Sequence, residues 1–291
     1  MTVVELLDRP VITMLEVSTK IPLYKIGQYS RFAHGIPETQ YVSDGMAIMH
    51  GDVFSVAEQI YIDIECKVSE RLAREINRHR HTAIVQKSTR YNNYSKLDKI
   101  EFYAPPELAE FLDLKQSYGA TITKMQLARN YSKAYGKAKP VPDELLNYLL
   151  PLGTMTEVRY HINLRSLIHM FNVRLCPQAL IEFRQFLELV KERIAEISDQ
   201  WNYIAHFYFN PKCLAGNKFD CKNYEMPCKT KIYSLYDYNK LYEEYEPKNE
   251  VQAMLKESHG SMFHVITEKD AKNKQAEKSY IERINSSEVQ K

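Results

Sequence analysis

The most informative stretch of this sequence is Arg78-His79-Arg80-His81-Thr82-Ala83-Ile84-Val85-Gln86-Lys87-Ser88-Thr89-Arg90-Tyr91. It begins with four consecutive basic side chains and ends with a serine, a threonine, an arginine and a tyrosine. Neighbouring residues of a helix diverge by about 100°, so four in a row cannot share one helix face. Some of these groups therefore point into a pocket, where arginine suits phosphate or carbonyl oxygens. The alternative is a solvated basic turn after a helix.

The residues before this stretch predict a helix over residues 70–80. Ser69 is a good N-cap, and Leu72 and Ile76 lie one turn apart on an apolar side. The basic residues would then end the helix, where cations suit the negative end of its dipole. We expect residues 81–91 to form a loop, which is where binding groups commonly lie.

The rest of the chain mixes strand and helix patterns, without internal repeats. Alternating or β-branched apolar residues predict strands at three places: residues 11–17, 59–66 and 155–162. Helical spacing predicts three helical regions: about 105–135 with a break near Gly119, 143–150, and 163–207 with an interruption near Cys176. Residues 20–50 give no clear pattern, and residues 266–291 have the composition of a solvated, partly disordered tail.

Composition limits the class of protein. The chain has 291 residues, 44% of them hydrophobic, which is enough for one large domain or two modest ones. A formal net charge of +2 gives no global attraction to nucleic acid, which opposes a nucleic-acid-binding protein built on residues 78–81. There is no signal region and no apolar run of about 20 residues, and five cysteines without a disulfide framework are expected to be reduced. We expect a soluble cytoplasmic protein with neither nucleic-acid nor membrane partners.

A second stretch, read together with the first, makes a family resemblance more specific. It is Asn163-Leu164-Arg165-Ser166-Leu167-Ile168-His169-Met170-Phe171-Asn172-Val173-Arg174. Arg-His-Arg, then seven residues, then Ser88 resembles the signature of the flavin-dependent thymidylate synthases, the ThyX family, and residues 90–91 extend the likeness. The second stretch is similar to the family's Asn-x-Arg-Ser-Leu segment with its downstream arginine. The resemblance covers about residues 10–230 and includes a weaker likeness, at residues 211–228, to a cysteine-bearing tail.

The resemblance implies an α+β fold, with a central antiparallel sheet flanked by long helices, assembled as a homotetramer. It implies a catalytic domain over residues 1–230 that binds flavin and nucleotide, followed by a charged, tyrosine-rich and partly disordered extension over residues 231–291. The implied reaction is the reductive methylation of dUMP to dTMP, with methylenetetrahydrofolate as carbon donor and FAD reduced by NADPH. The expected partners are therefore a pyrimidine nucleotide, folate and NADPH.

The resemblance also assigns candidate site residues. The flavin-binding positions are Ser55, Glu58, Arg78, His79, Arg80, His81, Asn163, Arg165 and His169. The nucleotide-binding positions are Glu75, Gln86, Ser88, Thr89, Arg90, Tyr91 and Arg174. Arg90 would hold phosphate, and Arg174, the candidate catalytic residue, would donate to a pyrimidine carbonyl and stabilise the charge that builds on the ring. A partly buried helix histidine is the alternative for His169, and plain packing is the alternative for Tyr91.

The residues favour chemistry without a covalent protein nucleophile. The chain lacks a Pro-Cys-His segment, and neither Cys66 nor Cys176 has an evident base beside it. A flavin would then carry the hard chemistry, while the protein supplies orientation and electrostatics. Ser88 is expected to form hydrogen bonds and not to attack, since no histidine–carboxylate pair is placed to activate it.

Several positions depart from the family's pattern, mostly on the nucleotide side. The family's Asn-Glu before the serine is Val85-Gln86, a glutamine is Glu75, an arginine near the phosphate is Asn147, and a histidine is Val53. Losing one charged clamp can weaken binding by a few kcal/mol. The identity of the nucleotide therefore stays open, and UMP, dCMP or a hydroxymethylated product is the alternative.

A zinc site is the other chemistry that the cysteines suggest. Cys213, Cys221 and Cys228 have no Cys-x-x-Cys pair, and a fourth ligand would have to be borrowed, with His206 as the candidate. We expect reduced structural thiols and no metal.

Overall fold

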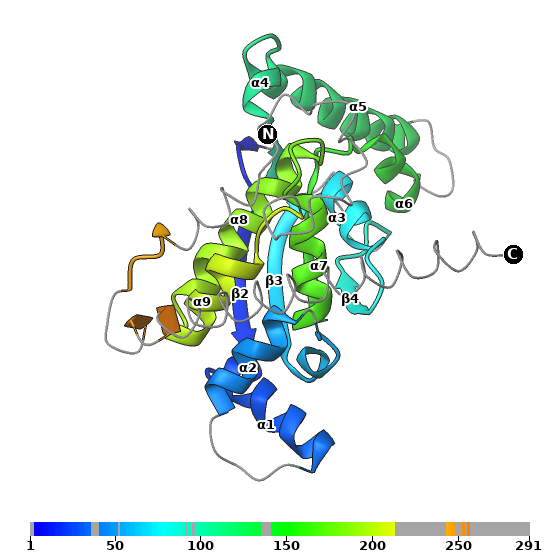
Figure 1. Cartoon of the computed structure of the whole chain (residues 1–291). Helices are drawn as coiled ribbons and strands as arrows, with labels where there is room; N and C mark the ends of the chain where they lie inside the picture. Colours follow the sequence, from blue (N-terminus) through cyan, green and yellow to red (C-terminus); the bar gives the residue numbers. More distant parts are fainter. Residues whose placement is uncertain are drawn as a thin grey trace, which may run out of the picture. The chain divides into compact units, whose positions relative to one another are not determined.

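In the computed structural model, strands and helices follow one another irregularly along the chain (Figure 1). The structure describes residues 3–35, 41–51, 53–90, 92, 94, 97–134, 141–212, 243–247, 252, 253, 255 and 256. The chain divides into two units, one of Met1–Lys20 with Ala57–Ser234, the other of Ile21–Val56 with Leu235–Lys291. All the candidate site residues except Ser55 belong to the first unit.

The first unit contains a four-stranded antiparallel sheet. Its strands, in spatial order, are β2 (Val11–Val17), β3 (Tyr61–Ser69), β6 (Met155–Asn163) and β4 (Thr82–Gln86). The central pair is in register over nine residues of each strand, from Tyr61 opposite Asn163 to Ser69 opposite Met155. The three strands expected from the sequence are confirmed, and so is the α+β class with an antiparallel sheet.

Alternation along these strands decides which face is covered. Ile62 and Ile64 are buried, whereas Asp63 between them lies on the other, partly exposed face. Helix α8 (Ile181–Ala195) covers the apolar face, where the ring of Phe186 lies 6.1 Å from that of Tyr160 on β6. Helix α7 (Leu164–Arg174) continues directly from β6, and α9 (Asp199–Tyr208) packs on α8 (Figure 1).

The expected helical region 163–207 is confirmed, with a second interruption at residues 196–198 that the sequence analysis did not predict. Side-chain caps explain where two of its helices begin. Asn163 accepts a hydrogen bond from the backbone N–H of Ser166, and Ser198 accepts one from that of Trp201.

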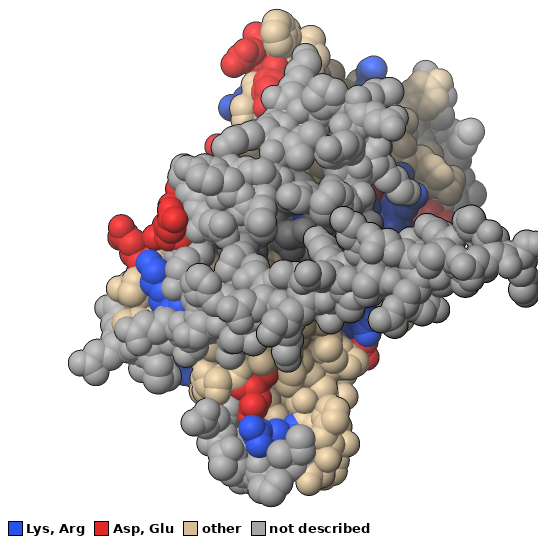
Figure 2. Space-filling model, viewed as in Figure 1, with Lys and Arg blue, Asp and Glu red and all other residues tan. Residues whose placement is uncertain are grey.

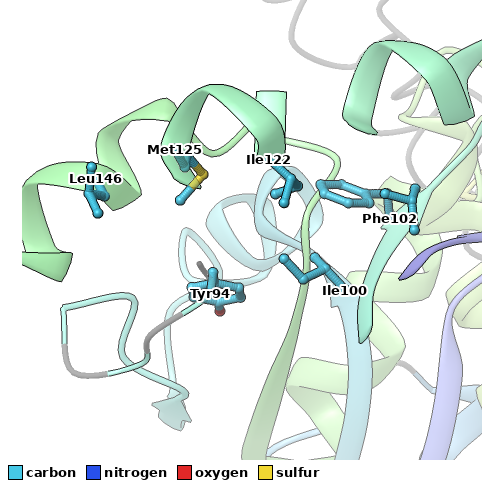
Figure 3. Close-up of a cluster of buried hydrophobic side chains, with 7 residues drawn as sticks. Tyr94, Ile100, Phe102, Ile122, Met125 and Leu146 are labelled. Atoms are coloured by element: carbon cyan, nitrogen blue, oxygen red, sulfur yellow. The ribbon is translucent and has the colours of Figure 1, made fainter. Parts of the chain in front are cut away.

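A smaller assembly is built on a two-stranded parallel sheet, β1 (Val3–Leu7) with β5 (Lys99–Tyr103). Helices α4 (Pro106–Ala109), α5 (Leu114–Ala134) and α6 (Asp143–Leu146) and the short η3 (Asn147–Leu149) follow β5 along the chain. Figure 3 shows the core that joins most of these elements: Val4, Tyr94, Ile100, Phe102, Ile122, Met125 and Leu146. The expected helix break near Gly119 was wrong, because Gly119 lies inside α5 and the interruption falls at residues 110–113.

In the second unit, residues 20–50 form two helices that the sequence pattern did not reveal. These are α1 (Pro22–His34) and α2 (Tyr41–His50), and an ion pair between Arg31 and Asp44 joins them. The helices approach so closely that a Cβ atom at Gly45 would lie 2.0 Å from the Leu23 carbonyl oxygen. The short η1 (Val56–Gln59) then leads into β3.

The region around residues 78–91, called the signature stretch below, differs from expectation in two ways. Helix α3 (Glu70–Ile76) ends before the basic residues, and residues 82–86 are strand β4 and not part of a loop. The strand forms because β6 offers a free edge, on which Thr82 pairs with Ile162 and Gln86 with Val158. The proposed extension over 231–291 and the three tail cysteines lie almost wholly outside the described residues. The domain boundary and the homotetramer stay predictions.

Candidate functional site

The signature stretch is held in place by the junction of β3 and α3. Ser69 caps α3 by accepting from the Leu72 N–H, and its own hydroxyl and N–H both donate to the carboxyl of Glu182 on α8. This junction is buried, and burial raises the pKa of Glu182. After α3 the chain turns through residues 77–81, where His81 adopts the left-handed region with φ of 64°. The turn places the four basic residues between α3 and β4.

Arg174, at the end of α7, is the centre of the first cluster of candidate residues. Its Nε donates to Nε2 of His79 over 3.0 Å, and its Nη2 lies 3.2 Å from Oε2 of Glu75. The guanidinium also lies 5.3 Å from the ring centroid of Phe183 on α8. These contacts bring together the two stretches that the sequence analysis singled out.

His79 is held in its neutral form. Burial, followed by the charges of Arg174 and His169, lowers the pKa of His79 to about 4, with Glu75 acting weakly in the opposite sense. Because Nε2 accepts from Arg174, the ring proton of the neutral form lies on Nδ1. His79 therefore orients Arg174 and adds no charge to the cluster at neutral pH.

Glu75 connects the cluster to Arg78. One of its oxygens lies 3.5 Å from Arg78 and the other reaches Arg174, so one carboxylate faces two guanidinium groups. The side chain of Arg78 is 74% exposed. Arg80 and His81 are also exposed. Arg78, Arg80 and His81 thus expose donors to an anionic ligand, whereas His79 does not.

The α7 stretch offers a second set of candidates. Arg165 forms an ion pair with Glu58, a neighbour that the resemblance also assigned to flavin. Arg165 and His169 are both exposed on α7, in agreement with their spacing of one helical turn. The side-chain oxygen of Asn163 caps α7, so its amide nitrogen is the group left for a ligand. Ser55 is exposed and lies in the other unit.

The turn after β4 holds the phosphate-binding candidates. The Ser88 hydroxyl accepts from the Arg90 N–H, and Arg90 forms an ion pair with Glu144 on α6 over 3.0 Å. Asn147 donates from Nδ2 to the carbonyl oxygens of Thr89 and Asn92. The residue that replaces an arginine of the family pattern therefore fixes the turn that carries Arg90. Tyr91 lies outside the described residues.

Gln86, at the end of β4, is bonded on both sides. Its Nε2 donates to Glu70 Oε2 over 3.0 Å, and its Oε1 accepts from Asn77 over 3.2 Å. Burial raises the pKa of Glu70 despite hydrogen bonds from Thr156 and Gln86 and the charge of Arg74. The amide at position 86 thus has a carboxyl group as its immediate neighbour.

Of the two cysteines in the described residues, Cys66 is unsuited to nucleophilic attack. Cys66 lies buried in β3, and burial, with the charges of Glu65 and Glu182, raises its pKa to about 12. A thiol held in this state is a poor nucleophile, because attack requires the thiolate. Cys176, at the end of α7, is half-buried.

Sequence reasoning missed several residues that shape the site. Phe183, Glu144, Asn77 and Glu70 each contact a candidate residue, but none stands next to its partner in sequence. Glu70 could have been noticed as a carboxylate in the first turn of a capped helix. The other contacts depend on long-range pairing, for which one sequence carries no signal.

Two kinds of feature are absent from the described part of the chain. It contains no group of three metal-ligating side chains, and none of its helices is long and apolar enough to cross a membrane. On the face shown in Figure 2, acidic and basic side chains lie near one another, as the small net charge suggests.

Comparison with known proteins relates the chain to one family. A family model described as "Thymidylate synthase complementing protein" matches residues 36–198. Curated flavin-dependent thymidylate synthases match from Thermus thermophilus, with 30% identity over 151 residues, and from Clostridium tetani, with 25% over 175. These alignments cover 47% and 55% of this chain, and 54% and 66% of the relatives, so the chain spans just over half to two thirds of their length.

A solved structure shares the fold. The UMP/dUMP methylase PolB from Streptomyces cacaoi, bound with 5-Br dUMP, superposes with a TM-score of 0.54 and 15% identity, covering 71% of this chain and 99% of that one. At this identity the likeness concerns the fold alone. The family model, which spans more than half of the sequence, goes further: the chain belongs to the ThyX family, the flavin-dependent thymidylate synthases.

Proposed function

We propose that this chain binds FAD and methylates C5 of a pyrimidine nucleotide, converting dUMP to dTMP with methylenetetrahydrofolate as carbon donor and NADPH as reductant. The observation that carries the proposal is the contact of Arg174 with His79 and Glu75. It joins the signature stretch to the α7 stretch, as an enzyme that grips cofactor and pyrimidine side by side requires.

The residues present fit a flavin with its phosphates. Arg78, Arg80 and His81 expose donors from one turn, and Arg165 and His169 expose more from α7. Guanidinium groups bind phosphate in fork geometry, and imidazole and amide groups bond ring heteroatoms. Flavin would supply the hydride that completes the methyl group, since no protein side chain can. The protein's own contribution is to bind, orient and stabilise charge.

Arg174 is the proposed catalytic residue. C5 of uracil becomes nucleophilic as negative charge builds on the ring oxygens, and a fixed guanidinium beside a carbonyl stabilises that charge. The contacts with His79, Glu75 and Phe183 fix Arg174 before any ligand binds. This arrangement reduces the reorganisation that the transition state would otherwise demand.

A second candidate function keeps the flavin and changes the nucleotide or the product. Asn147 stands where the family pattern has an arginine near the phosphate, and its amide is bonded to two backbone carbonyls, so the proposed surroundings of the nucleotide differ from that pattern. Glu75 supports the second candidate, since a carboxylate accepts hydrogen bonds and would favour a ligand that presents N–H or O–H groups. The candidates are UMP, dCMP and a hydroxymethylated product.

One experiment tests both proposals. The purified full-length chain is first titrated with FAD while its visible spectrum is recorded, and then incubated with NADPH, methylenetetrahydrofolate and each of dUMP, UMP and dCMP. Flavin bands and dTMP identified by mass are the expected result. A modified UMP or dCMP product would establish the second candidate, and a chain that gains no flavin bands would overturn both.

A further inference from the structure

Gln86 has an orientation that two neighbours impose. Asn77 donates to its oxygen, and Glu70 accepts from its nitrogen. A side-chain amide can usually turn over at little cost, because oxygen and nitrogen have nearly the same shape. An ionised Glu70 can only accept, so it selects the orientation with the Gln86 nitrogen toward it, and the Asn77 amide matches that orientation by presenting its own nitrogen. The second hydrogen of Gln86 Nε2 then stays available as a donor.

The other oxygen of Glu70 lies in a buried polar cluster. Glu70 Oε1, Thr156 Oγ1 and Tyr94 Oη are buried, and within the described residues none has a hydrogen bond of regular geometry. Thr156 on β6 is 2% exposed and Tyr94 is 4% exposed. Figure 3 shows the hydroxyl of Tyr94 turned away from the apolar side chains of Met125 and Leu146. Burial raises the pKa of both Glu70 and Tyr94, and Thr156 acts to lower both, so the three polar groups lie beside one another.

We propose that Glu70 is a positioning residue for nucleotide binding: it fixes the amide of Gln86 so that the free hydrogen of Gln86 Nε2 faces the ligand. The inference rests on the proposed function, because it takes the ligand to be a pyrimidine nucleotide with acceptor oxygens. The carboxyl group that the family pattern places at position 86 is thereby present one hydrogen bond further away, on α3.

The protonation state of Glu70 controls the orientation of the Gln86 amide. An ionised carboxylate accepts from Gln86, whereas a protonated carboxyl can also donate to the amide oxygen and allow the reversed orientation. The groups that face Glu70 are Arg74 on α3, Gln86 on β4 and Thr156 on β6, and Glu70 in turn acts on Tyr94 together with Glu157. Burial raises the pKa of Glu70, so ionisation and the productive orientation are reached only at a higher pH than for an exposed glutamate.

The test uses the full-length protein and three variants: Glu70→Gln, Gln86→Glu, and the double variant that carries both substitutions. Glu70→Gln leaves an amide that bonds Gln86 in either orientation, so only about half of the molecules hold Gln86 productively and the dissociation constant of the nucleotide should rise about twofold, with kcat little changed. The double variant keeps a hydrogen bond between positions 70 and 86 but places a carboxylate without a donor at position 86, so it should bind no better than Glu70→Gln. Glu110→Gln, an exposed glutamate after α4, is the matched control and should bind as the wild type does.

Measuring affinity against pH separates positioning from a structural role. The wild type should bind more tightly as Glu70 ionises, and this rise should be absent in Glu70→Gln, while the titration of the nucleotide's own phosphate is common to both and cancels in their ratio. Equal affinity and an equal pH profile in Glu70→Gln and the wild type would overturn the inference. So would a double variant that binds as tightly as the wild type, because its position 86 has no donor. A wild type that binds none of dUMP, UMP and dCMP would overturn the proposed function, and the inference with it.

Discussion

Arg174 and Arg90 are two arginines of the same proposed site, but they differ in exposure and in the contacts that hold them. The side chain of Arg174 is 24% exposed and contacts groups on α3, on the following turn and on α8. The side chain of Arg90 is 66% exposed and pairs with Glu144, itself 49% exposed. A guanidinium held by several partners is preorganised, whereas an exposed ion pair is weak and adjustable. The difference assigns charge stabilisation to Arg174 and adaptable phosphate binding to Arg90.

Replacing Arg174 should produce the largest effect. Arg174→Lys keeps the charge but loses the bond to His79 and the planar contact with Phe183, so we expect kcat to fall by about 10²–10³-fold. Single-turnover kinetics with the flavin already reduced measure this step directly. Arg90→Lys is the matched substitution and should mainly weaken nucleotide binding. Equal losses of kcat in the two variants would remove the distinction between the arginines.

Substitution of Asn147 tests whether its hydrogen bonds stabilise the turn that carries Arg90. Asn147→Asp preserves the size of the side chain but cannot donate to the carbonyls of Thr89 and Asn92, and its charge repels them. We expect the free energy of unfolding to fall by about 1–3 kcal/mol and the nucleotide to bind more weakly. Chemical denaturation and equilibrium binding measure the two effects.

Asn147→Ala, which removes the donor without adding charge, should lie between the wild type and Asn147→Asp in both measurements. If the aspartate variant were as stable as the wild type, the turn would owe nothing to these hydrogen bonds. The difference between Arg174 and Arg90 would then be larger, because the turn that carries Arg90 would not depend on Asn147.

Local patterns explain what the sequence predicted and where it failed. The alternation in β3 and the N-cap at Ser69 are properties of neighbouring residues, and both appear in the structure. Strand β4 was missed because its pairing with the edge of β6 joins residues about 80 positions apart, as Thr82 opposite Ile162 shows. The helices around Gly45 were missed because close packing, and not amphipathic spacing, fixes their arrangement.

The site shows the same limit. Family resemblance pointed to His79 and Arg174 separately, and the structure shows them in contact. It could not reveal that His79 is an acceptor for Arg174, because that role depends on burial and on the direction of one ring nitrogen. Nor could it reveal that Asn147 holds a turn, since the two carbonyls it contacts belong to a segment far away in the chain.

His79 allows the Arg174 cluster to be tested through stability alone. The pKa of His79 is lowered from 6.5 to about 4 in the folded protein, so unfolded chains bind a proton that folded chains exclude. The stability that the neutral ring contributes is therefore complete above about 6.5 and lost as the pH falls toward about 4. His79→Gln removes this titration, and its unfolding free energy should depend less on pH across that window.

The measurement is chemical denaturation of both proteins at several pH values, and the difference between them cancels the titration of all other groups. The two curves should converge toward low pH. Parallel curves would mean that folding does not change the pKa of His79. The claim that a neutral His79 holds Arg174 would then be wrong.

The smallest effect is expected at Glu144. Because Glu144→Gln removes only an exposed ion pair, the free energy of unfolding should change by less than about 1 kcal/mol. Without the Glu144 charge, Arg90 attracts a phosphate more strongly, so nucleotide affinity should rise slightly at low salt and return to the wild-type value as salt screens the charges. Binding measured at two ionic strengths tests this. A loss of affinity in Glu144→Gln would show that the ion pair holds Arg90 in its binding position, and the adjustable arginine would then be preorganised as Arg174 is.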